Sequence, residues 1–343
     1  MSMHVAVIGS GIAGVTFAEE ILKLERQLYV TLLTREKCGY YSRPLLSHGF
    51  SRGDIETKIV LKSFAALVAA DIAVESGAEV LRLDRSSKTL HFRKNGIETP
   101  LSYDKVVLAT GSDALIPPPF RAQASLFNVL NSLEDLVKLR RQREKILSRH
   151  PRPRWAVIGG GLIGCEISAD LSKAGDEVVL FHALPRLMER QLVEEDSVNL
   201  LGVLRDKLGI EVLLDKAVRG FSGSEMDLSV NLESETVQGF HGIIVACGFR
   251  PRIELAIEAG LETRRGIVVD EFLTSTSDHD VYAIGDSAEL PDGKLYAYVT
   301  PVRSQGLWLA KHILGQDDQA WQVPSFKPKA KIPGFEAVAG YLF

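Results

Sequence analysis

The same pattern of apolar and small residues occurs twice along the chain. In each copy, a short apolar run leads into three glycines spaced Gly-x-Gly-x-x-Gly, then into a stretch with helical periodicity and a second apolar run. The copies span residues 4–34 and 154–183, with glycines at Gly9, Gly11 and Gly14 and at Gly159, Gly161 and Gly164. Strand, glycine turn, helix and strand in this order predict a dinucleotide-binding unit, so the sequence predicts two of them.

The three glycines of such a turn have different physical tasks. The first permits a tight turn, the second lets a pyrophosphate approach the bare backbone, and the third lets the helix pack closely against the strand. Unpaired N–H groups and the partial positive charge at the helix N-terminus then bind the phosphates. The alternative is that both turns are structural and bind nothing, but two copies in the same context favour nucleotide binding.

The residue that ends the second strand of each unit departs from the usual pattern. An Asp or Glu there commonly accepts a hydrogen bond from the adenosine ribose, whereas this chain has Thr34 and His182. Arg186 and Arg190 follow His182 and could meet the 2′-phosphate of NADPH. We expect NADH as the nicotinamide cofactor, with NADPH as the alternative.

One further repeated pattern and a run of prolines indicate the domain boundaries. Apolar strands at residues 106–109 and 242–246 are each followed by a small residue, a glycine and an exit containing proline. Pro117–Pro119 stiffen the chain and suit a crossing between domains. We therefore predict an α/β protein with two Rossmann-like nucleotide-binding domains, the second inserted into the first. The predicted segments are 1–118 and 249–320 for the first domain, 119–248 for the second, and 321–343 for a short C-terminal region.

Composition and charge narrow the class of protein. The 343 residues carry a formal charge of -4, which argues against general nucleic-acid binding, and their 45% hydrophobic content is ordinary for a globular protein. No apolar run approaches the roughly 20 residues of a membrane helix, and the N-terminus shows no export-signal pattern. Cys38, Cys165 and Cys247 are far apart, which excludes a Cys-x-x-Cys pair or a local zinc site. We expect a cytoplasmic protein with no metal site and no nucleic-acid or membrane partner.

Five motifs resemble, in order, those of the pyridine nucleotide–disulfide oxidoreductase superfamily: VIGSGIAG, VVLATG, VIGGGLIG, VACGFRP and YAIGD. Within that superfamily, YSRPLLS, GLETRRGIVVD, AYVTP and KIP are most similar to the rubredoxin reductases. The resemblance implies that the first domain binds FAD and that the inserted domain binds NAD(P)H. Two features depart from that branch: Arg43 stands where a lysine is usual, and the C-terminal region is shorter, so that the usual interface domain is incomplete or absent.

The resemblance also implies which residues hold the cofactors. The first turn should cradle the FAD pyrophosphate, Thr34 and Arg35 should lie near the adenosine, Val80 should contact the adenine, and Asp286 should hold the ribityl chain. The implied FAD residues are Gly9, Gly11, Ile12, Ala13, Gly14, Thr34, Arg35, Arg43, Pro44, Val80, Ala109, Thr110, Gly111, Gly285, Asp286, Val299 and Lys331. The implied NAD(P)H residues are Gly159, Gly161, Leu162, Ile163, Gly164, Glu166, His182, Arg186, Cys247 and Gly248.

Three residues are the implied catalytic groups. Arg43 is expected beside flavin N5 and paired with Glu166, where its charge would stabilise the anionic reduced flavin. A buried ion pair is costly unless both partners are satisfied, which argues against a purely structural pair. Lys331 is expected near the other end of the isoalloxazine ring. The alternative places Arg43 in solvent and Glu166 on a helix surface, and Cys38 is expected to be structural or incidental.

These implications predict hydride transfer from NAD(P)H to FAD and electron transfer onward to a small iron protein such as rubredoxin. One alternative is an NADH oxidase whose reduced flavin meets oxygen directly. Another is a redox-gated binding protein similar to the apoptosis-inducing flavoproteins. The basic stretch from Lys138 to Arg154 could dock an acidic partner, although such charge runs are more often solvated helix faces.

Overall fold

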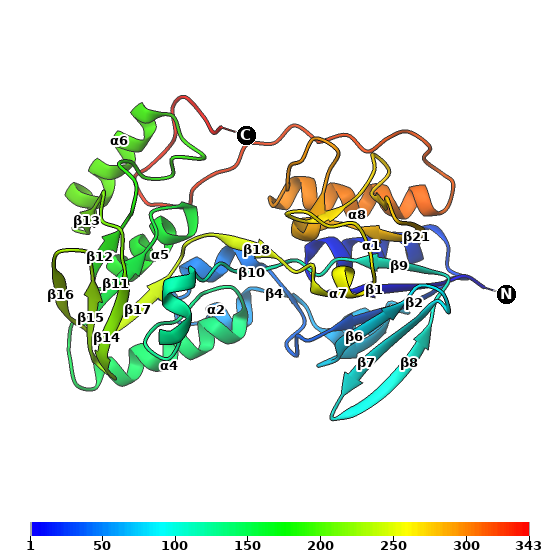
Figure 1. The fold of residues 1–343 in the computed structure, drawn as a ribbon, viewed down its shortest axis with the longest axis horizontal. Coiled ribbons are helices and arrows are strands. Elements are labelled where there is room, and N and C mark those ends of the chain that lie inside the picture. Colours follow the sequence, from blue (N-terminus) through cyan, green and yellow to red (C-terminus); the bar gives the residue numbers. More distant parts are fainter. Residues whose placement is uncertain (1, 343) are drawn as a thin grey trace. The chain divides into compact units, whose positions relative to one another are not determined.

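The chain folds into two compact units in the computed structural model, which describes residues 2–342 (Figure 1). Unit 1 comprises Met1–Ser42, Val60–Asp113 and Arg250–Phe326, and unit 2 comprises Arg43–Ile59, Ala114–Phe249 and Lys327–Phe343. The outermost ends of the predicted domains, residues 1 and 343, lie outside the described residues. None of the helices in the described part of the chain has the length and apolar character needed to cross a membrane.

Residues 43–59 were predicted in the first domain and residues 327–343 in a separate C-terminal region, but both segments pack in unit 2. The predicted crossings after residues 118 and 248 lie close to the observed ones after Asp113 and Phe249, but residues 43–59 and 327–343 pack with the middle of the chain. The physical reason is a buried acidic side chain of unit 2, which accepts hydrogen bonds from both segments. Each unit is therefore assembled from three separate stretches of chain.

Unit 1 is built on a six-stranded sheet with order β20-β21-β9-β1-β2-β5, parallel except for the pair β20–β21. Its strands are β1 (His4–Ile8), β2 (Tyr29–Thr34), β5 (Ala73–Ser76), β9 (Lys105–Leu108), β20 (Thr274–Ser275) and β21 (Asp278–Ala283). The chain order reverses at β1, which lies between β2 and β9. Ligands of α/β proteins bind at such a switch point, beyond the carboxyl ends of the strands.

Helices α1 (Ile12–Leu24) and α8 (Val299–Ile313) pack against each other in unit 1. Their backbones approach closely at Gly306, where a Cβ would lie only 2.8 Å from the carbonyl oxygen of Ala13. The remaining elements of the unit are β3 (Tyr40–Tyr41), β4 (Val60–Lys62), α3 (Phe64–Val68), β6 (Glu79–Asp84), β7 (Thr89–Lys94), β8 (Ile97–Ser102), α7 (Glu254–Glu258), β19 (Ile267–Val268), the 3-10 turn η4 (Gly285–Ser287) and β22 (Ala288–Glu289).

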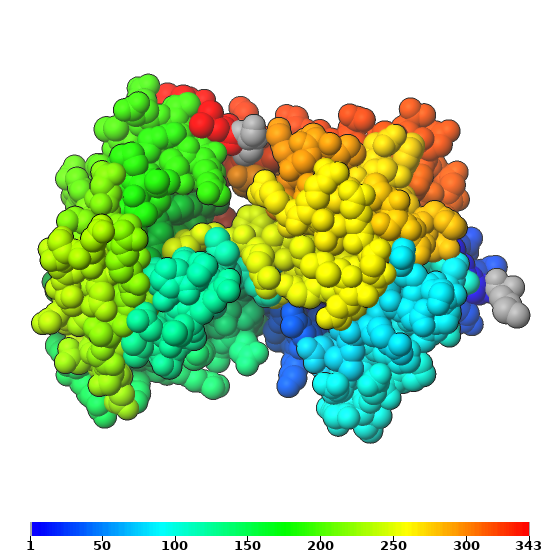
Figure 2. All heavy atoms as spheres, viewed as in Figure 1, coloured from blue at the N-terminus to red at the C-terminus, as the bar shows by residue number. Residues whose placement is uncertain are grey.

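Unit 2 repeats this architecture on a parallel sheet of order β13-β12-β11-β17. Its main elements are β11 (Arg154–Ile158), α5 (Leu162–Lys173), β12 (Glu177–Phe181), β13 (Glu211–Leu213) and β17 (Gly242–Val245). The antiparallel strands β14 (Gly220–Ser224), β15 (Asp227–Asn231) and β16 (Thr236–Phe240) form the left edge of this unit in Figures 1 and 2. The other elements are η1 (Arg43–His48), α2 (Ile55–Lys58), η2 (Pro118–Gln123), α4 (Leu133–Leu147), α6 (Glu194–Gly202) and η3 (Val203–Lys207). Strands β10 (Ser112–Ala114) and β18 (Phe249–Pro251) lie where the chain passes between the units.

Two parallel sheets with the same switch-point arrangement confirm the predicted α/β fold class. The basic stretch from Lys138 to Arg154 lies only partly in a helix, α4. This helix begins with a capping box between Ser132 and Asp135 and ends at Leu147 rather than continuing to residue 154. Pro151 and Pro153 follow, and proline cannot continue a helix because it lacks the backbone donor.

Candidate functional site

The glycine turn of unit 1 has no room for a side chain at two of its three glycines. Gly9 has φ +118°, and a Cβ there would lie 2.1 Å from the carbonyl oxygen of Ala109. A Cβ on Gly14 would lie 2.1 Å from the carbonyl oxygen of Gly9. By contrast, a Cβ on Gly11 would meet no atom within 4 Å. The outer glycines bring helix and strands together, and the middle one leaves the N-terminus of α1 open, as a bound pyrophosphate requires.

Several predicted FAD residues gather at the same edge of the sheet. Ala109–Gly111 follow β9, and Gly285 and Asp286 follow β21, so both groups lie at carboxyl ends of parallel strands. Gly285 also lies against α1, because a Cβ there would be 3.2 Å from the Cβ of Ala13. The carboxyl ends of the adjacent strands β1, β9 and β21 thus lie near the first turn of α1, which begins at Ile12.

Two contacts that the sequence did not predict hold this edge together. The Ser112 hydroxyl donates to the carboxylate of Asp286 at 2.8 Å, and the backbone N–H of Gly285 donates to Oε1 of Gln305 at 2.7 Å. The amide nitrogen of Gln305 is buried and has no hydrogen-bond partner in the described part of the chain. A buried donor without a partner is costly, and an acceptor on a bound ligand would satisfy it. The edge therefore fits a nucleotide such as FAD.

The end of β2 is arranged differently from the prediction. The buried hydroxyl of Thr34 is hydrogen-bonded to Ser10 at 2.8 Å and accepts from the N–H of Glu36 at 3.1 Å. Thr34 therefore fixes the turn, and Arg35 beside it is exposed. Glu36, whose carboxylate accepts from the phenol of Tyr41 at 2.9 Å, is the acidic side chain next to this strand end. Glu36 was not predicted, because the usual pattern places the acidic residue at the last position of the strand and Glu36 lies two residues beyond it.

Val80 and Val299 lie on other elements of unit 1. Val80 is partly buried in β6, where it pairs with Phe92 of β7. Val299 is the first residue of α8 and is 47% exposed. Their contacts with FAD stay predictions.

The glycine turn of unit 2 has the same geometry as the first. Gly159 has φ +115°, and a Cβ there would lie 2.4 Å from the carbonyl oxygen of Ala246. A Cβ on Gly164 would lie 1.9 Å from the carbonyl oxygen of Gly159, whereas a Cβ on Gly161 would meet nothing within 4 Å. The first turn of α5 begins at Leu162 and presents Ile163, which is 44% exposed. This turn therefore also fits a dinucleotide pyrophosphate.

The side chains of His182 and Arg186 both make hydrogen bonds within unit 2. Nδ1 of the buried His182 accepts the backbone N–H of Gly160 at 3.0 Å, so Nε2 carries the proton. That nitrogen lies 3.0 Å from the Arg186 carbonyl and 3.2 Å from the carboxylate of Glu189. The Arg186 guanidinium donates to the carbonyls of Leu192 and Glu189. Arg186 thus stabilises the loop after β12, and the nearest charge to His182 on that loop is negative.

Cys247 and Gly248 follow β17, at the carboxyl edge of the unit 2 sheet. The Cys247 thiol lies 3.5 Å from the carbonyl oxygen of Ile158, and burial raises its pKa to about 11. Gly248 has φ +108°, a conformation that a residue with a side chain rarely adopts. Both residues therefore shape the sheet edge beside the glycine turn.

Glu166 is a buried carboxylate with partners from both outlying segments of unit 2. It lies on α5 and is 5% exposed. One oxygen accepts the Ser47 hydroxyl at 2.6 Å, and the other accepts the backbone N–H of Lys331 at 2.9 Å. The ammonium of Lys331 donates to the carbonyl oxygen of Pro44 at 2.7 Å. Glu166 therefore joins η1, α5 and the C-terminal segment into one polar cluster. The sequence predicted Glu166, Pro44 and Lys331 as site residues, but it did not predict Ser47.

Arg43 begins η1, beside this cluster in the sequence. Its Nη1 donates to the carbonyl oxygen of Asn131 at 2.5 Å. The predicted ion pair of Arg43 with Glu166 stays a prediction. The half-buried Lys331 has a lowered pKa, because burial outweighs the attraction of Glu166.

The cysteines offer no pair that could relay electrons. Cys38 is exposed, whereas Cys165 and Cys247 are buried to different degrees. Burial raises the pKa of the Cys165 thiol far above its usual range. Thiolates are the reactive form of cysteine, so Cys165 and Cys247 are inert at neutral pH.

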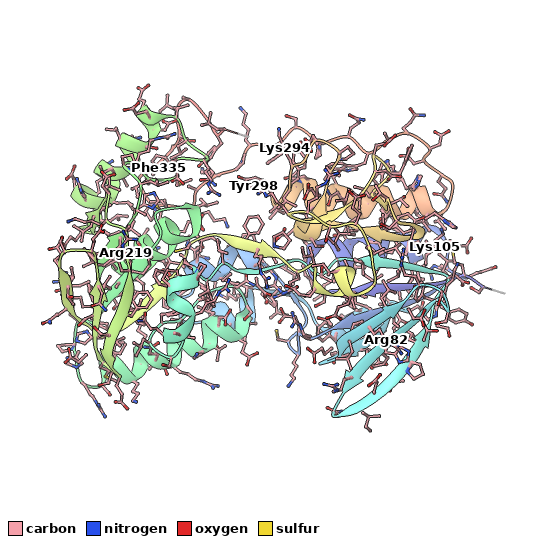
Figure 3. The ribbon with its side chains drawn as sticks, viewed as in Figure 1. Arg82, Lys105, Arg219, Lys294, Tyr298 and Phe335 are labelled. Atoms are coloured by element: carbon pink, nitrogen blue, oxygen red, sulfur yellow. The ribbon has the colours of Figure 1, made fainter. Side chains whose placement is uncertain are left out.

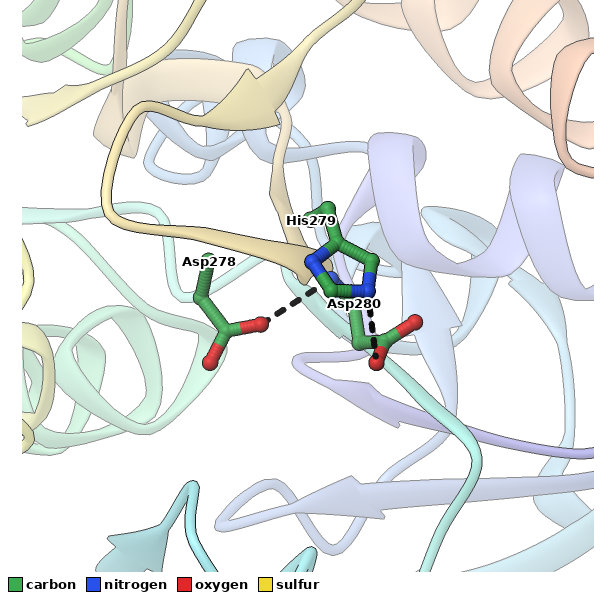
Figure 4. A group of neighbouring side chains, drawn as sticks. All are labelled: Asp278, His279 and Asp280. Atoms are coloured by element: carbon green, nitrogen blue, oxygen red, sulfur yellow. Dashed lines mark hydrogen bonds and ion pairs between the residues drawn. The ribbon is translucent and has the colours of Figure 1, made fainter.

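One side-chain group in the described part of the chain has the composition of a metal site: Asp278, His279 and Asp280 (Figure 4). Asp280 is already paired with Lys88 at 2.6 Å and with Lys105, labelled in Figure 3, at 3.4 Å. The side chain of His279 is 90% exposed. The group also lies at the amino end of β21, at the edge opposite to the glycine turn. We therefore assign no metal to it.

The chain matches a family model and a curated relative over most of its length. The model described as pyridine nucleotide-disulphide oxidoreductase matches residues 3–306. The rubredoxin-NAD(+) reductase of Alcanivorax borkumensis is 34% identical over 324 residues, covering 92% of this chain and 80% of the relative.

Solved structures agree with this match. A covalent putidaredoxin reductase–putidaredoxin complex contains a chain with a TM-score of 0.84 and 26% identity, covering 96% of this chain and 79% of that one. A NAD-dependent persulfide reductase from A. fulgidus has a TM-score of 0.88 and 26% identity over 96% of this chain, which spans only 62% of that longer one. The chain therefore belongs to the pyridine nucleotide-disulphide oxidoreductases, a family of oxidoreductases that use FAD and NAD(P)H.

Proposed function

We propose that this protein takes reducing equivalents from NADH into a bound FAD and passes the electrons to a small iron protein of the rubredoxin type. The observation that carries the proposal is the pair of glycine turns. Each has an open space at its middle glycine, Gly11 in unit 1 and Gly161 in unit 2. One chain thus offers two pyrophosphate sites, as hydride transfer between two dinucleotides requires.

Unit 1 is the FAD domain in this proposal. The turn from Gly9 to Gly14 would hold the pyrophosphate, Glu36 would take the ribose in place of Thr34, and Asp286 would hold the ribityl chain. Support comes from the convergence of these residues at the carboxyl edge of one sheet. When bound, FAD supplies a two-electron acceptor for hydride and a donor of single electrons.

Unit 2 is the NADH domain, with its pyrophosphate on the turn from Gly159 to Gly164. A 2′-phosphate on the adenosine ribose would meet the carboxylate of Glu189 near His182. The Arg186 guanidinium would not bind this phosphate, because it already donates to backbone carbonyls. Like charges at close range repel, so this loop favours NADH over NADPH. The same geometry argues against the role that the sequence suggested for Arg186.

Glu166 acts in this proposal through the segments that it holds. Its two hydrogen bonds fix Ser47 and the backbone of Lys331, and Lys331 in turn holds the carbonyl of Pro44. A buried carboxylate with both oxygens satisfied is a rigid support. It would keep Arg43 and Lys331 oriented toward the flavin, where their positive charges would stabilise its reduced, anionic form.

The absence of a usable thiol pair supports direct electron transfer to a protein acceptor. Cys165 is buried and Cys247 is partly buried, both with raised pKa values, and Cys38 is exposed. Relatives act on the same class of acceptor, since the relative from Alcanivorax borkumensis is a rubredoxin-NAD(+) reductase. Three cysteines far apart in the sequence also suit the reducing cytoplasm, which we propose as its location.

The test is stopped-flow reoxidation of holoenzyme that has first been reduced with NADH under anaerobic conditions. Three acceptors are compared: a rubredoxin, oxygen at air saturation and ferricyanide. Reoxidation by rubredoxin that is faster than by oxygen and that saturates with rubredoxin concentration supports the proposal. Faster reaction with oxygen makes the protein an NADH oxidase. Slow reaction with all three acceptors, with a persistent long-wavelength absorbance band, makes it a redox-gated binding flavoprotein, and a protein that binds no FAD ends the proposal.

A further inference from the structure

Unit 2 contains a cavity near the end of α5 that lies away from its glycine turn. Its volume is about 430 Å³, which is in the range of small-ligand sites. Its walls come from three parts of unit 2: the end of η1 and the loop after it, the second half of α5, and the C-terminal segment. The lining residues are His48, Arg52, Ala169, Asp170, Lys173 and residues 329–335, including Phe335, which Figure 3 labels.

This cavity is separate from the glycine turn of the same unit. The turn lies at the N-terminus of α5, which begins at Leu162, whereas the cavity is lined by Ala169 and Lys173. At a rise of 1.5 Å per residue, these two residues lie about 10 and 16 Å along the helix axis from Leu162. A pyrophosphate bound on the turn therefore does not occupy this cavity.

The charges around the cavity are mostly positive. Arg52, Lys173, Lys329 and Lys331 contribute four cationic side chains. Across residues 2–342, the side chains of the first three have neither a hydrogen bond nor an ion pair, and all three are exposed at the rim. Cations that converge without counter-charge repel one another. An anion at their centre would remove that repulsion.

The single acidic side chain of the lining, Asp170, offsets only one of these four positive charges. One oxygen of Asp170 accepts the backbone N–H groups of Phe50 and Ser51 at 2.8 and 3.0 Å, and the other accepts the Ser51 hydroxyl at 2.5 Å. Asp170 is thus engaged in holding the loop after η1. The site keeps an excess of positive charge.

The floor of the cavity also holds an unsatisfied polar atom. Nε2 of His48 is buried and has no hydrogen-bond partner in the part of the chain that the structure describes, while Nδ1 lies 3.9 Å from Asp170. Burial lowers the pKa of His48 and of Lys331, since neither charge is fully compensated there. A bound anion would offer Nε2 a partner and would favour the charged form of both side chains.

We propose that this cavity is a second anion site, which binds a small phosphate-bearing ligand on Arg52, Lys173, Lys329 and His48. A phosphate group fits the donor set better than a single carboxylate. It carries roughly two negative charges near neutral pH and offers three acceptor oxygens. The planar fork of Arg52 can bind two phosphate oxygens at once, and the lysines add point charges. The proposal does not depend on the identity of the electron acceptor.

The experiment measures binding of inorganic pyrophosphate to the FAD-loaded protein by isothermal titration calorimetry. Saturating NAD+ is present to occupy the glycine turn of unit 2. Orthophosphate is a second probe, which separates recognition of one phosphate from recognition of two, and potassium chloride at matched ionic strength measures general screening. The test variant is Lys173→Gln combined with Lys329→Gln. The matched control is Lys138→Gln combined with Arg141→Gln, which removes two exposed charges from α4 of the same unit.

The proposal predicts saturable binding of one pyrophosphate per chain. Binding should weaken about tenfold or more in the test variant, because two charge-assisted contacts are lost, and should stay close to wild type in the control. Melting temperature and flavin absorbance verify that both variants are folded and loaded. The proposal is overturned if no saturable binding occurs, if potassium chloride reproduces the effect, if both double variants weaken binding equally, or if the test variant binds as tightly as wild type.

Discussion

Gly164 allows a quantitative test of the second nucleotide site. In Gly164→Ala, the new methyl group would lie 1.9 Å from the carbonyl oxygen of Gly159, where ordinary contacts begin at 3.4 Å. Helix α5 would therefore have to move away from the turn by about 1.5 Å, the difference of these two distances. Overpacking of this kind costs about 1–3 kcal/mol. We expect the melting temperature to fall by about 2–4 °C for each kcal/mol, and NADH binding to weaken because the helix N-terminus is displaced.

Gly161→Ala is the matched control, since it adds the same methyl group three residues away. The added Cβ meets nothing within 4 Å, and the φ of -78° suits any residue. Stability should change by less than about 1 kcal/mol, the difference between glycine and alanine at a helix N-cap. The methyl group would, however, occupy the space through which a pyrophosphate approaches the backbone. NADH binding should weaken about tenfold or more, equivalent to about 1.4 kcal/mol.

The assay combines thermal melts followed by circular dichroism with stopped-flow reduction of the flavin over a range of NADH concentrations. The expected pattern is a lower melting temperature and weaker NADH binding for Gly164→Ala, but weaker binding alone for Gly161→Ala. If Gly161→Ala binds NADH like wild type, the turn of unit 2 does not hold a pyrophosphate. If Gly164→Ala melts like wild type, the close packing of α5 on the turn is not rigid, and the steric argument is refuted.

Three other substitutions have defined outcomes. Glu166→Gln removes the buried charge but keeps the side-chain shape. It should lower the limiting rate of flavin reduction by about tenfold or more without weakening NADH binding. An unchanged rate in stopped flow would contradict a role of Glu166 in orienting the flavin site. Ser112→Ala removes the donor to Asp286, a bond to a charged group worth about 1.5–3 kcal/mol, so FAD should dissociate about tenfold or more readily on dilution, as followed by flavin fluorescence. Wild-type retention of FAD would argue that Asp286 needs no such support. Cys38→Ser should keep turnover with ferricyanide within about twofold of wild type, because no thiol lies in the electron path, and a large loss would restore a role for this cysteine.

The two nucleotide folds could be predicted from the sequence because their signals are local. A tight turn, a close helix and a strand edge are encoded within a dozen residues around Gly9 and again around Gly159. Thr34, which ends β2, and His182, which directly follows β12, were also correctly recognised as departures from the usual acidic residue. Their hydrogen bonds to Ser10 and Gly160 explain why they are suited to a structural task.

The partners of Glu166 could not be predicted because they depend on long-range packing. Ser47 precedes it by 119 residues and Lys331 follows it by 165, and neither spacing has a sequence signature. For the same reason, residues 43–59 and 327–343 could not be assigned to unit 2 from the order of motifs. Signals for Glu36 and Ser112 were present, since one is acidic just after β2 and the other follows the strand motif that ends at Gly111.

The composition of unit 2 from three distant stretches affects how the protein can fold during synthesis. Helix α5 emerges from the ribosome long before the segment that begins at Lys327, so one oxygen of Glu166 must wait for the backbone of Lys331. Until then, that carboxylate remains in water or is buried with an unsatisfied oxygen, which is unfavourable. The strands of this unit can form early, but its polar centre closes only when the segment that contains Lys331 has been added. Shortening the chain before Lys331 should therefore loosen unit 2 while leaving the sheet of unit 1 intact.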